Sequence, residues 1–99
     1  MRLLRDREGL TIRLTDERLG HILDHPEMVA MEAAIEETLA AADQIVQSRS
    51  DSQVRLYYRR YNETAVDDKL LCVVVKVLRD DAFVITAYLT DRTKRGTIL

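Results

Sequence analysis

The chain has 99 residues, of which 46% are hydrophobic and 32% are charged, and its net charge is −2. These values suit one globular domain with a single modest core. No apolar run approaches the roughly 20 residues that span a bilayer, and MRLLRDREGL lacks the apolar segment of a secretory signal. The one cysteine excludes an intramolecular disulfide and a cysteine metal cage. We therefore expect a cytoplasmic protein that does not contact a membrane.

Charge is unevenly distributed along the chain. Residues 1–52 carry six Lys or Arg and eleven Asp or Glu side chains, whereas residues 53–99 carry nine and six. An anionic partner is therefore expected to contact the second half. The overall acidity argues against a strong, general nucleic-acid binder, because such domains are usually basic.

Residues 11–42 are expected to form a short strand and two helices. TIRL (11–14) alternates as a strand does, Thr15 is a suitable N-cap for the first helix, and Pro26 ends or breaks that helix. Apolar side chains then recur at helical spacing from residue 28 to 42. They are Met28, Met31, Ile35, Leu39 and Ala42.

The second half is expected to consist of strands joined by short turns. The predicted strands cover residues 44–48, 54–61, 69–78 and 82–90, followed by a loop or short edge strand. Strands with such short connections pair in antiparallel fashion. We predict a single α+β domain over residues 1–99, in which two N-terminal helices pack on one face of a four- to five-stranded antiparallel sheet. Cys72 is expected to be a small buried hydrophobic residue within it.

Alternation divides each predicted strand between the two faces of the sheet. If the polar faces coincide, cations and tyrosines share one surface that suits a phosphate backbone and stacked bases. This surface contains Arg55, Tyr57, Arg59, Lys76, Thr86 and Tyr88. Polar side chains are equally expected on the water-facing side of any one-sided sheet. Lys76 is harder to explain in this way, because it lies inside an apolar strand and must snorkel or point into a site.

The stretch HILDHPEM (21–28) contains both histidines and the only proline. His21 and His25 share a side of an uninterrupted helix, and Glu17 lies one turn earlier. A metal site there lacks the HExxH pattern and three reliable ligands, so we expect no metal and no cofactor. An exposed helix end is the simpler expectation for His21. Pro26 holds His25 at a helix break, so His25 is a candidate acid or base for proton transfer near neutral pH.

Four stretches together resemble a known group of proteins: LTDERLGHILDHPEM, VRLYYRR, LCVVVKVL and FVITAYLTD. They are similar to the small phage- and mobile-element-associated domains with the barnase–EndoU–colicin–RelE-like (BECR) ribonuclease fold. The shared order is a helix ending in His-Pro-Glu, a strand with aromatic residues and arginine, a valine-rich strand, and a strand ending in Thr-Ala-Tyr. The resemblance covers about residues 11–92.

The resemblance implies metal-free RNA cleavage, in which a 2′-hydroxyl attacks the adjacent phosphate and leaves a cyclic phosphate. By position in the motifs, His25 is the expected base or acid. Arg59 and Lys76 are expected to hold the phosphate, and alternation favours Arg59 over Arg60. Thr86 and Tyr88 are expected to orient the phosphate or share proton transfer. The expected RNA-binding residues are Arg55, Tyr57 and Arg59.

Three functions remain open at this point. The first is a toxin-like or phage-associated endoribonuclease. The second is a non-catalytic RNA- or protein-binding module on the same fold, with an antitoxin or another protein as its partner. Acidic side chains of the first half favour a protein partner, namely Glu32, Glu36, Glu37 and Asp43. The third is a homodimer paired edge to edge through the RGTIL end.

Overall fold

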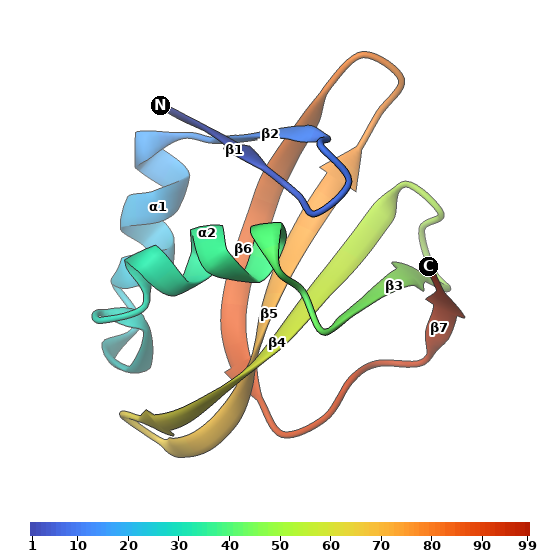
Figure 1. Cartoon of the computed structure of the whole chain (residues 1–99). Coiled ribbons are helices and arrows are strands. Elements are labelled where there is room, and N and C mark those ends of the chain that lie inside the picture. The colour runs from blue at the N-terminus through green and yellow to red at the C-terminus, as the bar shows by residue number, and fades with distance from the viewer.

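The computed structural model describes residues 1–99 and contains seven strands, two α-helices and one short 3-10 helix (Figure 1). In chain order they are β1 (Arg2–Arg5), β2 (Thr11–Leu14), α1 (Asp16–Leu23), η1 (Pro26–Met28), α2 (Glu32–Ala40), β3 (Gln44–Ser48), β4 (Val54–Thr64), β5 (Asp67–Val77), β6 (Ala82–Thr90) and β7 (Gly96–Ile98). No helix is both long enough and apolar enough to cross a membrane.

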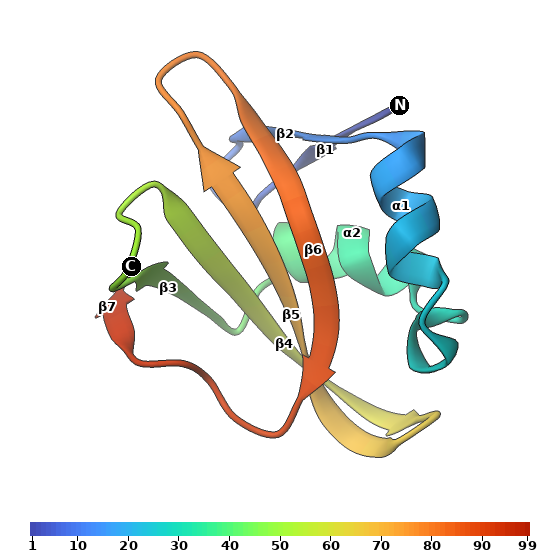
Figure 2. The ribbon, with the colours of Figure 1, turned by 180° about the vertical axis from the view of Figure 1, so that it is seen from behind.

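All seven strands belong to one sheet, in the order β1-β2-β6-β5-β4-β3-β7. The strands from β3 to β6 form an antiparallel meander, and β1 pairs with β2 in an antiparallel hairpin. β2 runs parallel to β6. Residues 91–95, which we call the crossover, carry the chain from β6 back to the far edge, where β7 pairs with β3 (Figure 2).

The predicted four- to five-stranded antiparallel sheet is wrong, because the sheet has seven strands and is mixed. β1 was not predicted, and the short β7 was only one of two expectations for the chain end. With four and three residues, these edge strands are too short for alternation to stand out. The parallel pair joins Arg13 to Phe83, which are distant in the sequence, so no local turn signal indicates it.

The helices begin and end close to residues that the sequence marks. The side chain of Thr15 caps α1 by accepting a hydrogen bond from the backbone N–H of Arg18, as predicted. Pro26 is the first residue of η1, where its fixed φ is favourable. The second helix starts at Glu32, four residues later than expected, because tight turns such as the hydrogen bond from the Met31 N–H to the Met28 carbonyl occupy the intervening segment.

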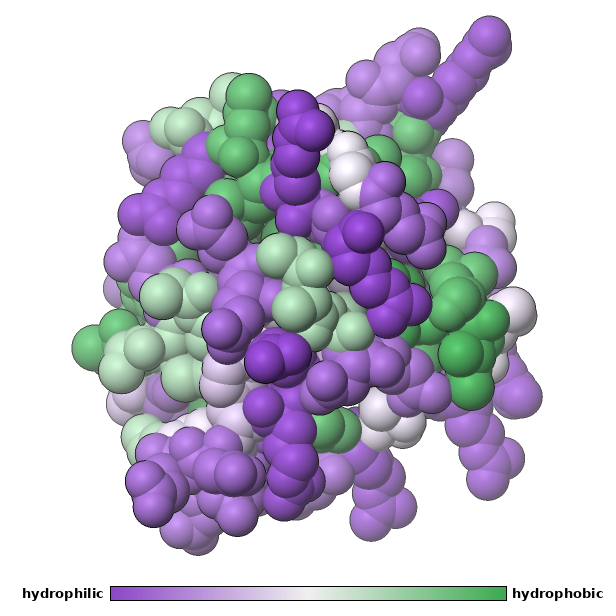
Figure 3. All heavy atoms as spheres, in the orientation of Figure 1, coloured by the Kyte–Doolittle hydropathy of each residue, from purple (hydrophilic) through white to green (hydrophobic).

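Both helices lie on one side of the sheet, where α1 contacts β6 and α2 contacts β1, β4 and β5 (Figures 1 and 2). The main core lies between these layers and contains 17 buried hydrophobic residues. Ile35 and Leu39 of α2 and Val73 of β5 are fully buried in it, and each such side chain stabilises the fold by about 1.5–3 kcal/mol. The outer surface on this side is mostly hydrophilic (Figure 3).

A second, smaller hydrophobic cluster lies on the other face of the sheet. Its four buried members are Val46, Leu56, Tyr58 and Cys72. Cys72 is a free, fully buried thiol, so its predicted role as a small buried hydrophobic residue is confirmed. The sheet is thus packed on both faces, strongly beneath the helices and weakly on the opposite side.

The two edges of the sheet are β1 and β7. Each carries a largely exposed hydrophobic side chain, Leu3 on β1 and Ile98 on β7. Exposed edges of this kind are able to pair with another strand. The homodimer expected from the sequence stays a prediction.

Gly96 begins β7 where the backbone lies directly against β3. A Cβ atom there would overlap the backbone oxygen of Gln47 and lie 2.7 Å from Cγ1 of Val46. We expect Gly96→Ala to lower the free energy of unfolding by about 1–3 kcal/mol, the usual cost of overpacking, in urea denaturation. Gly20→Ala in α1 is the control, because a Cβ meets nothing within 4 Å there and helix propensity favours Ala by up to ~1 kcal/mol. Equal stability of both variants would contradict the tight contact at Gly96.

Candidate nucleic-acid interface

The alternation of β5 decides which side chains face the helices. Val75 belongs to the main core, so its neighbour Lys76 points to the opposite side, which we call the open face. The strand register brings Lys76, Thr86 and Tyr88 together on this face. Across β4, β5 and β6, the open face consists of four rows: Val54–Lys76–Phe83, Leu56–Val74–Thr86, Tyr58–Cys72–Tyr88 and Arg60–Leu70–Thr90.

A β-bulge at Ile85 changes the alternation of β6. The register of β5 and β6 shifts there and leaves Ile85 without a partner. Phe83 therefore lies on the same face as Thr86, whereas Val84 belongs to the main core. Strict alternation predicts different faces for Phe83 and Thr86, and this prediction is wrong because of the extra residue.

Arg55, Tyr57 and Arg59 lie on the helix side of the sheet, so the six expected polar residues do not share one surface. The register pairs Tyr57 with Val73 of the main core. The assumption that the polar faces of β4 and β5 coincide is therefore wrong. Both faces of β4 carry a tyrosine and an arginine, so alternation alone does not indicate which face is covered.

Tyr57 is part of a buried hydrogen-bond network rather than an exposed stacking platform. It is completely buried, and its hydroxyl donates to Oδ2 of Asp6 at 2.7 Å. The other carboxylate oxygen of Asp6 accepts hydrogen bonds from the backbone N–H groups of Glu8 and Leu10, each at 2.9 Å. Burial, and then the bond to Asp6, raise the pKa of Tyr57. This network ties the turn between β1 and β2 to β4.

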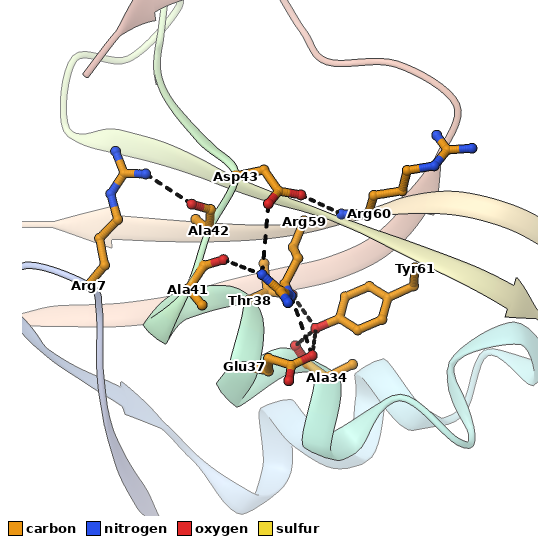
Figure 4. A network of polar contacts seen from close by, with 10 residues as sticks. All are labelled: Arg7, Ala34, Glu37, Thr38, Ala41, Ala42, Asp43, Arg59, Arg60 and Tyr61. Atoms are coloured by element: carbon orange, nitrogen blue, oxygen red, sulfur yellow. Dashed lines mark hydrogen bonds and ion pairs between the residues drawn. The ribbon is translucent and has the colours of Figure 1, made fainter.

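Arg59 holds the end of α2. Its Nη1 donates to the carbonyl oxygen of Ala41 at 2.8 Å, and its guanidinium forms ion pairs with Glu37 and Asp43 (Figure 4). Arginine in this position satisfies a free carbonyl and complements the negative end of the helix. The hydroxyl of Tyr61 donates to Oε1 of Glu37 at 2.7 Å. Arg59 would have to leave all these partners to bind a phosphate.

The two histidines lie in the helix layer and do not approach Lys76. His25 is exposed, precedes η1 without a side-chain capping bond, and lies beside Met28 of the main core. His25 and Lys76 are therefore on opposite sides of the sheet, and neither lines a surface pocket. Nε2 of His21 is 3.7 Å from Oε1 of Glu17, and both side chains are exposed. No group of three or more His, Cys, Asp or Glu side chains is arranged to hold a metal ion.

Lys76 forms an ion pair with Asp51, a residue that sequence analysis did not single out. Nζ of Lys76 lies 2.5 Å from Oδ2 of Asp51, and the side chain of Lys76 is 25% exposed. The hydrogen bond from Lys76 lowers the pKa of Asp51. Asp51 also accepts the backbone N–H of Gln53 through Oδ1. Lys76 is thus partly accessible and has a carboxylate beside it on the open face.

Two tyrosine hydroxyls surround the thiol of Cys72. Burial raises the pKa of Tyr58 to about 12 and also raises the pKa values of Tyr88 and Cys72. At neutral pH, the hydroxyl of Tyr88 is therefore a proton donor and the thiol is unreactive. The backbone N–H of Lys94 donates to the Tyr58 hydroxyl at 2.9 Å, which fixes the crossover over this row.

Five of the ten Lys and Arg side chains without an ion-pair partner lie around the open face. They lie on β4, on the turn after β3 and on the crossover, and they are Arg49, Arg60, Arg92, Lys94 and Arg95. Residues 16–43, which include both helices, carry eight acidic side chains and a single arginine. Most of the carboxylates in the acidic half of the sequence thus lie in the helix layer.

No family model matches the chain, and no curated protein and no solved structure is significantly similar to it.

Replacing Tyr57 by Phe leaves Oδ2 of Asp6 without its hydroxyl donor in a site that is 5% exposed. We expect Tyr57→Phe to lower the free energy of unfolding by about 1–3 kcal/mol, the cost of an unsatisfied buried acceptor, in urea denaturation. Tyr88→Phe is the matched control, because its hydroxyl lies beside the weakly hydrogen-bonding thiol of Cys72. Equal losses in both variants would contradict a structural role specific to Tyr57.

Proposed function

We propose that this chain acts on RNA as a metal-independent endoribonuclease, with the RNA backbone on the open face of the sheet. The observation that carries the proposal is the grouping of Lys76, Thr86 and Tyr88 on that face, beside Asp51 and among unpaired cations. The resemblance of the sequence motifs to the BECR ribonuclease domains supports the same reaction. An RNA substrate and a free, buried thiol are both expected of a cytoplasmic protein.

Electrostatics favour this face over the helix side for a polyanion. Phosphate groups are attracted to cations that no carboxylate neutralises, and Arg60 and the crossover cations have no ion-pair partner. The helix layer carries a large excess of acidic side chains, which repel RNA. A chain with a net charge of −2 therefore presents RNA with one attractive side.

Thr86 lies at the centre of the proposed reaction site. Tyr88 lies in the next row of β6, roughly 7 Å along the strand. Lys76 lies in the row on the other side but on β5, so a strand spacing of about 4.8 Å separates it further from Thr86. Lysine and tyrosine side chains are long enough to converge on a phosphate that the Thr86 hydroxyl contacts. Lys76 would stabilise the charge of the pentacovalent phosphate, and Tyr88 would donate a proton to the leaving 5′-oxygen.

Asp51 would accept the proton of the attacking 2′-hydroxyl, because it is the carboxylate paired with Lys76. Its contact with Lys76 brings a base and a cation to the same phosphate. Since the pKa of Asp51 is lowered, it is a weak base, and a slow enzyme is expected. The position of His25 on the other side of the sheet separates it from this reaction, so we assign it no part in the chemistry.

We expect the purified protein to cleave single-stranded RNA in EDTA and to leave 2′,3′-cyclic phosphate ends. Lys76→Ala and Tyr88→Phe should each lower the cleavage rate by roughly 10²-fold or more, as for lost charge stabilisation or a lost general acid. Asp51→Asn should lower it as well. The rates are measured by gel analysis of a labelled RNA, and thermal unfolding checks that each variant is folded.

His25→Ala is the control, with a cleavage rate expected within about twofold of the parent. A large loss in His25→Ala would move the active site to the helix side. If the parent protein binds RNA but does not cleave it, the chain is an RNA-binding module rather than an enzyme. If it does not bind RNA, both the ribonuclease and the RNA-binding function are contradicted.

The adjacent arginines Arg59 and Arg60 provide a second test, because they point in opposite directions (Figure 4). Arg60→Gln should weaken RNA binding and lower its salt dependence, as expected for one lost phosphate contact, without changing stability. Arg59→Gln should reduce stability by about 1–3 kcal/mol through the lost bonds to α2, with RNA affinity nearly unchanged. Binding is measured by fluorescence anisotropy and stability by urea denaturation. The opposite pattern would place the RNA on the helix side.

A further inference from the structure

A pocket of about 290 Å³ lies between β3 and the crossover, away from the Lys76 row. Its lining residues come from the open side of β3, the turn that follows it, and the chain from Thr93 into β7. The polar ones are Gln44, Arg49, Thr93, Lys94 and Arg95. None of the reaction-site residues proposed above lines this pocket.

Three cations and no carboxylate line the pocket. Arg49, Lys94 and Arg95 form no ion pair with any acidic side chain. The amide of Gln44 and the hydroxyl of Thr93 are further neutral donors at its walls. The other two pockets differ, since Arg13 in one is held by Asp81, and the second is lined by Asp80 and Asp81 themselves.

The pocket wall is fixed to the sheet at two points. The backbone N–H of Lys94 donates to the hydroxyl of the buried Tyr58. Gly96 brings the chain so close to Gln47 that no side chain fits between them. The cations therefore project from a backbone that is already ordered, which reduces the entropy lost on binding an anion.

We propose that this pocket binds the terminal phosphate of an RNA strand, and this inference rests on the proposed action on RNA. A terminal phosphate monoester carries about −1.5 to −2 charges at neutral pH, whereas a phosphate inside the strand carries one. Three unpaired cations match the monoester better. Inorganic phosphate has the same chemistry, so the test separates the two sources.

The pocket also gives the proposed cleavage a fixed position. Gln44 is in register with Tyr58, whose row continues through Cys72 to Tyr88. From β3 to β6 there are three strand spacings, or roughly 14 Å. An RNA whose end is held in the pocket would cross this distance before it reaches Thr86, so cleavage would occur a constant few nucleotides from the phosphorylated end.

The test compares three internally labelled RNAs of one sequence, with a 5′-phosphate, a 3′-phosphate or hydroxyls at both ends. Fluorescence anisotropy should show about tenfold tighter binding of one phosphorylated RNA, as expected for charge-assisted contacts. This advantage should fall below about twofold in Arg49→Gln/Arg95→Gln and in Lys94→Gln. Arg79→Gln, an exposed unpaired arginine outside the pocket, is the control and should keep the advantage.

Equal affinity for the three RNAs would overturn the pocket assignment while leaving RNA binding by the open face intact. An advantage that persists in the double variant would also overturn it. Titration with inorganic phosphate, followed by NMR at the backbone amides of Lys94 and Gly96, identifies the other source. Phosphate-induced shifts there without binding of any RNA would mean an inorganic phosphate site, and would reject both this inference and the proposed function.

Discussion

One face of β5 must be buried beneath the helices, whereas the other face carries a charged lysine. This constraint fixes the register of β5 and, through strand pairing, the orientation of the neighbouring strands. A slip of one residue would move Val73 and Val75 to the open face and bury Lys76 beneath the helices, where an unpaired charge costs several kcal/mol. β4 and β6 pair with β5 along most of their length, so their side chains take their orientation from it. The same register buries Tyr57 against Asp6 and aligns Lys76 with Thr86.

The same register also places the adjacent arginines Arg59 and Arg60 on opposite sides of the sheet. The acidic helices lie on the side of the sheet where Arg59 binds the end of α2. Arg59, which the sequence favours as a phosphate ligand, therefore forms contacts within the protein instead. Arg60, one residue later, has no ion-pair partner and belongs to the open face. Ion pairing thus neutralises some arginines and leaves others, such as Arg60, free to contact an anion.

Much of the architecture was predictable from local patterns, whereas pairings between distant segments were not. Apolar spacing and the Thr15 cap predicted the helices, and runs such as LLCVVVKVL predicted the long strands. The parallel pairing of β2 with β6 and the bulge at Ile85 depend on tertiary contacts that no window of sequence contains. Within the candidate site, Lys76, Thr86 and Tyr88 were correctly grouped. Asp51 was missed because it lies in a polar turn, and Tyr57 was misplaced because its hydroxyl partner is 51 residues away.

The crossover and β7 form the least secured part of the sheet. They are held by pairing at three positions of β3, by the hydrogen bond from the Lys94 N–H to Tyr58, and by the hydrogen bond from the Leu99 N–H to the Ile45 carbonyl, and none of their residues belongs to either hydrophobic cluster. Local opening of this C-terminal strap therefore requires less free energy than global unfolding, and it would expose the otherwise buried thiol of Cys72. An anion that binds between the strap and β3 would raise the free energy required for this local opening, because it binds only the closed form. The rate at which a thiol reagent labels Cys72 should therefore fall when the anion is bound, so it measures ligand occupancy without a label on the ligand.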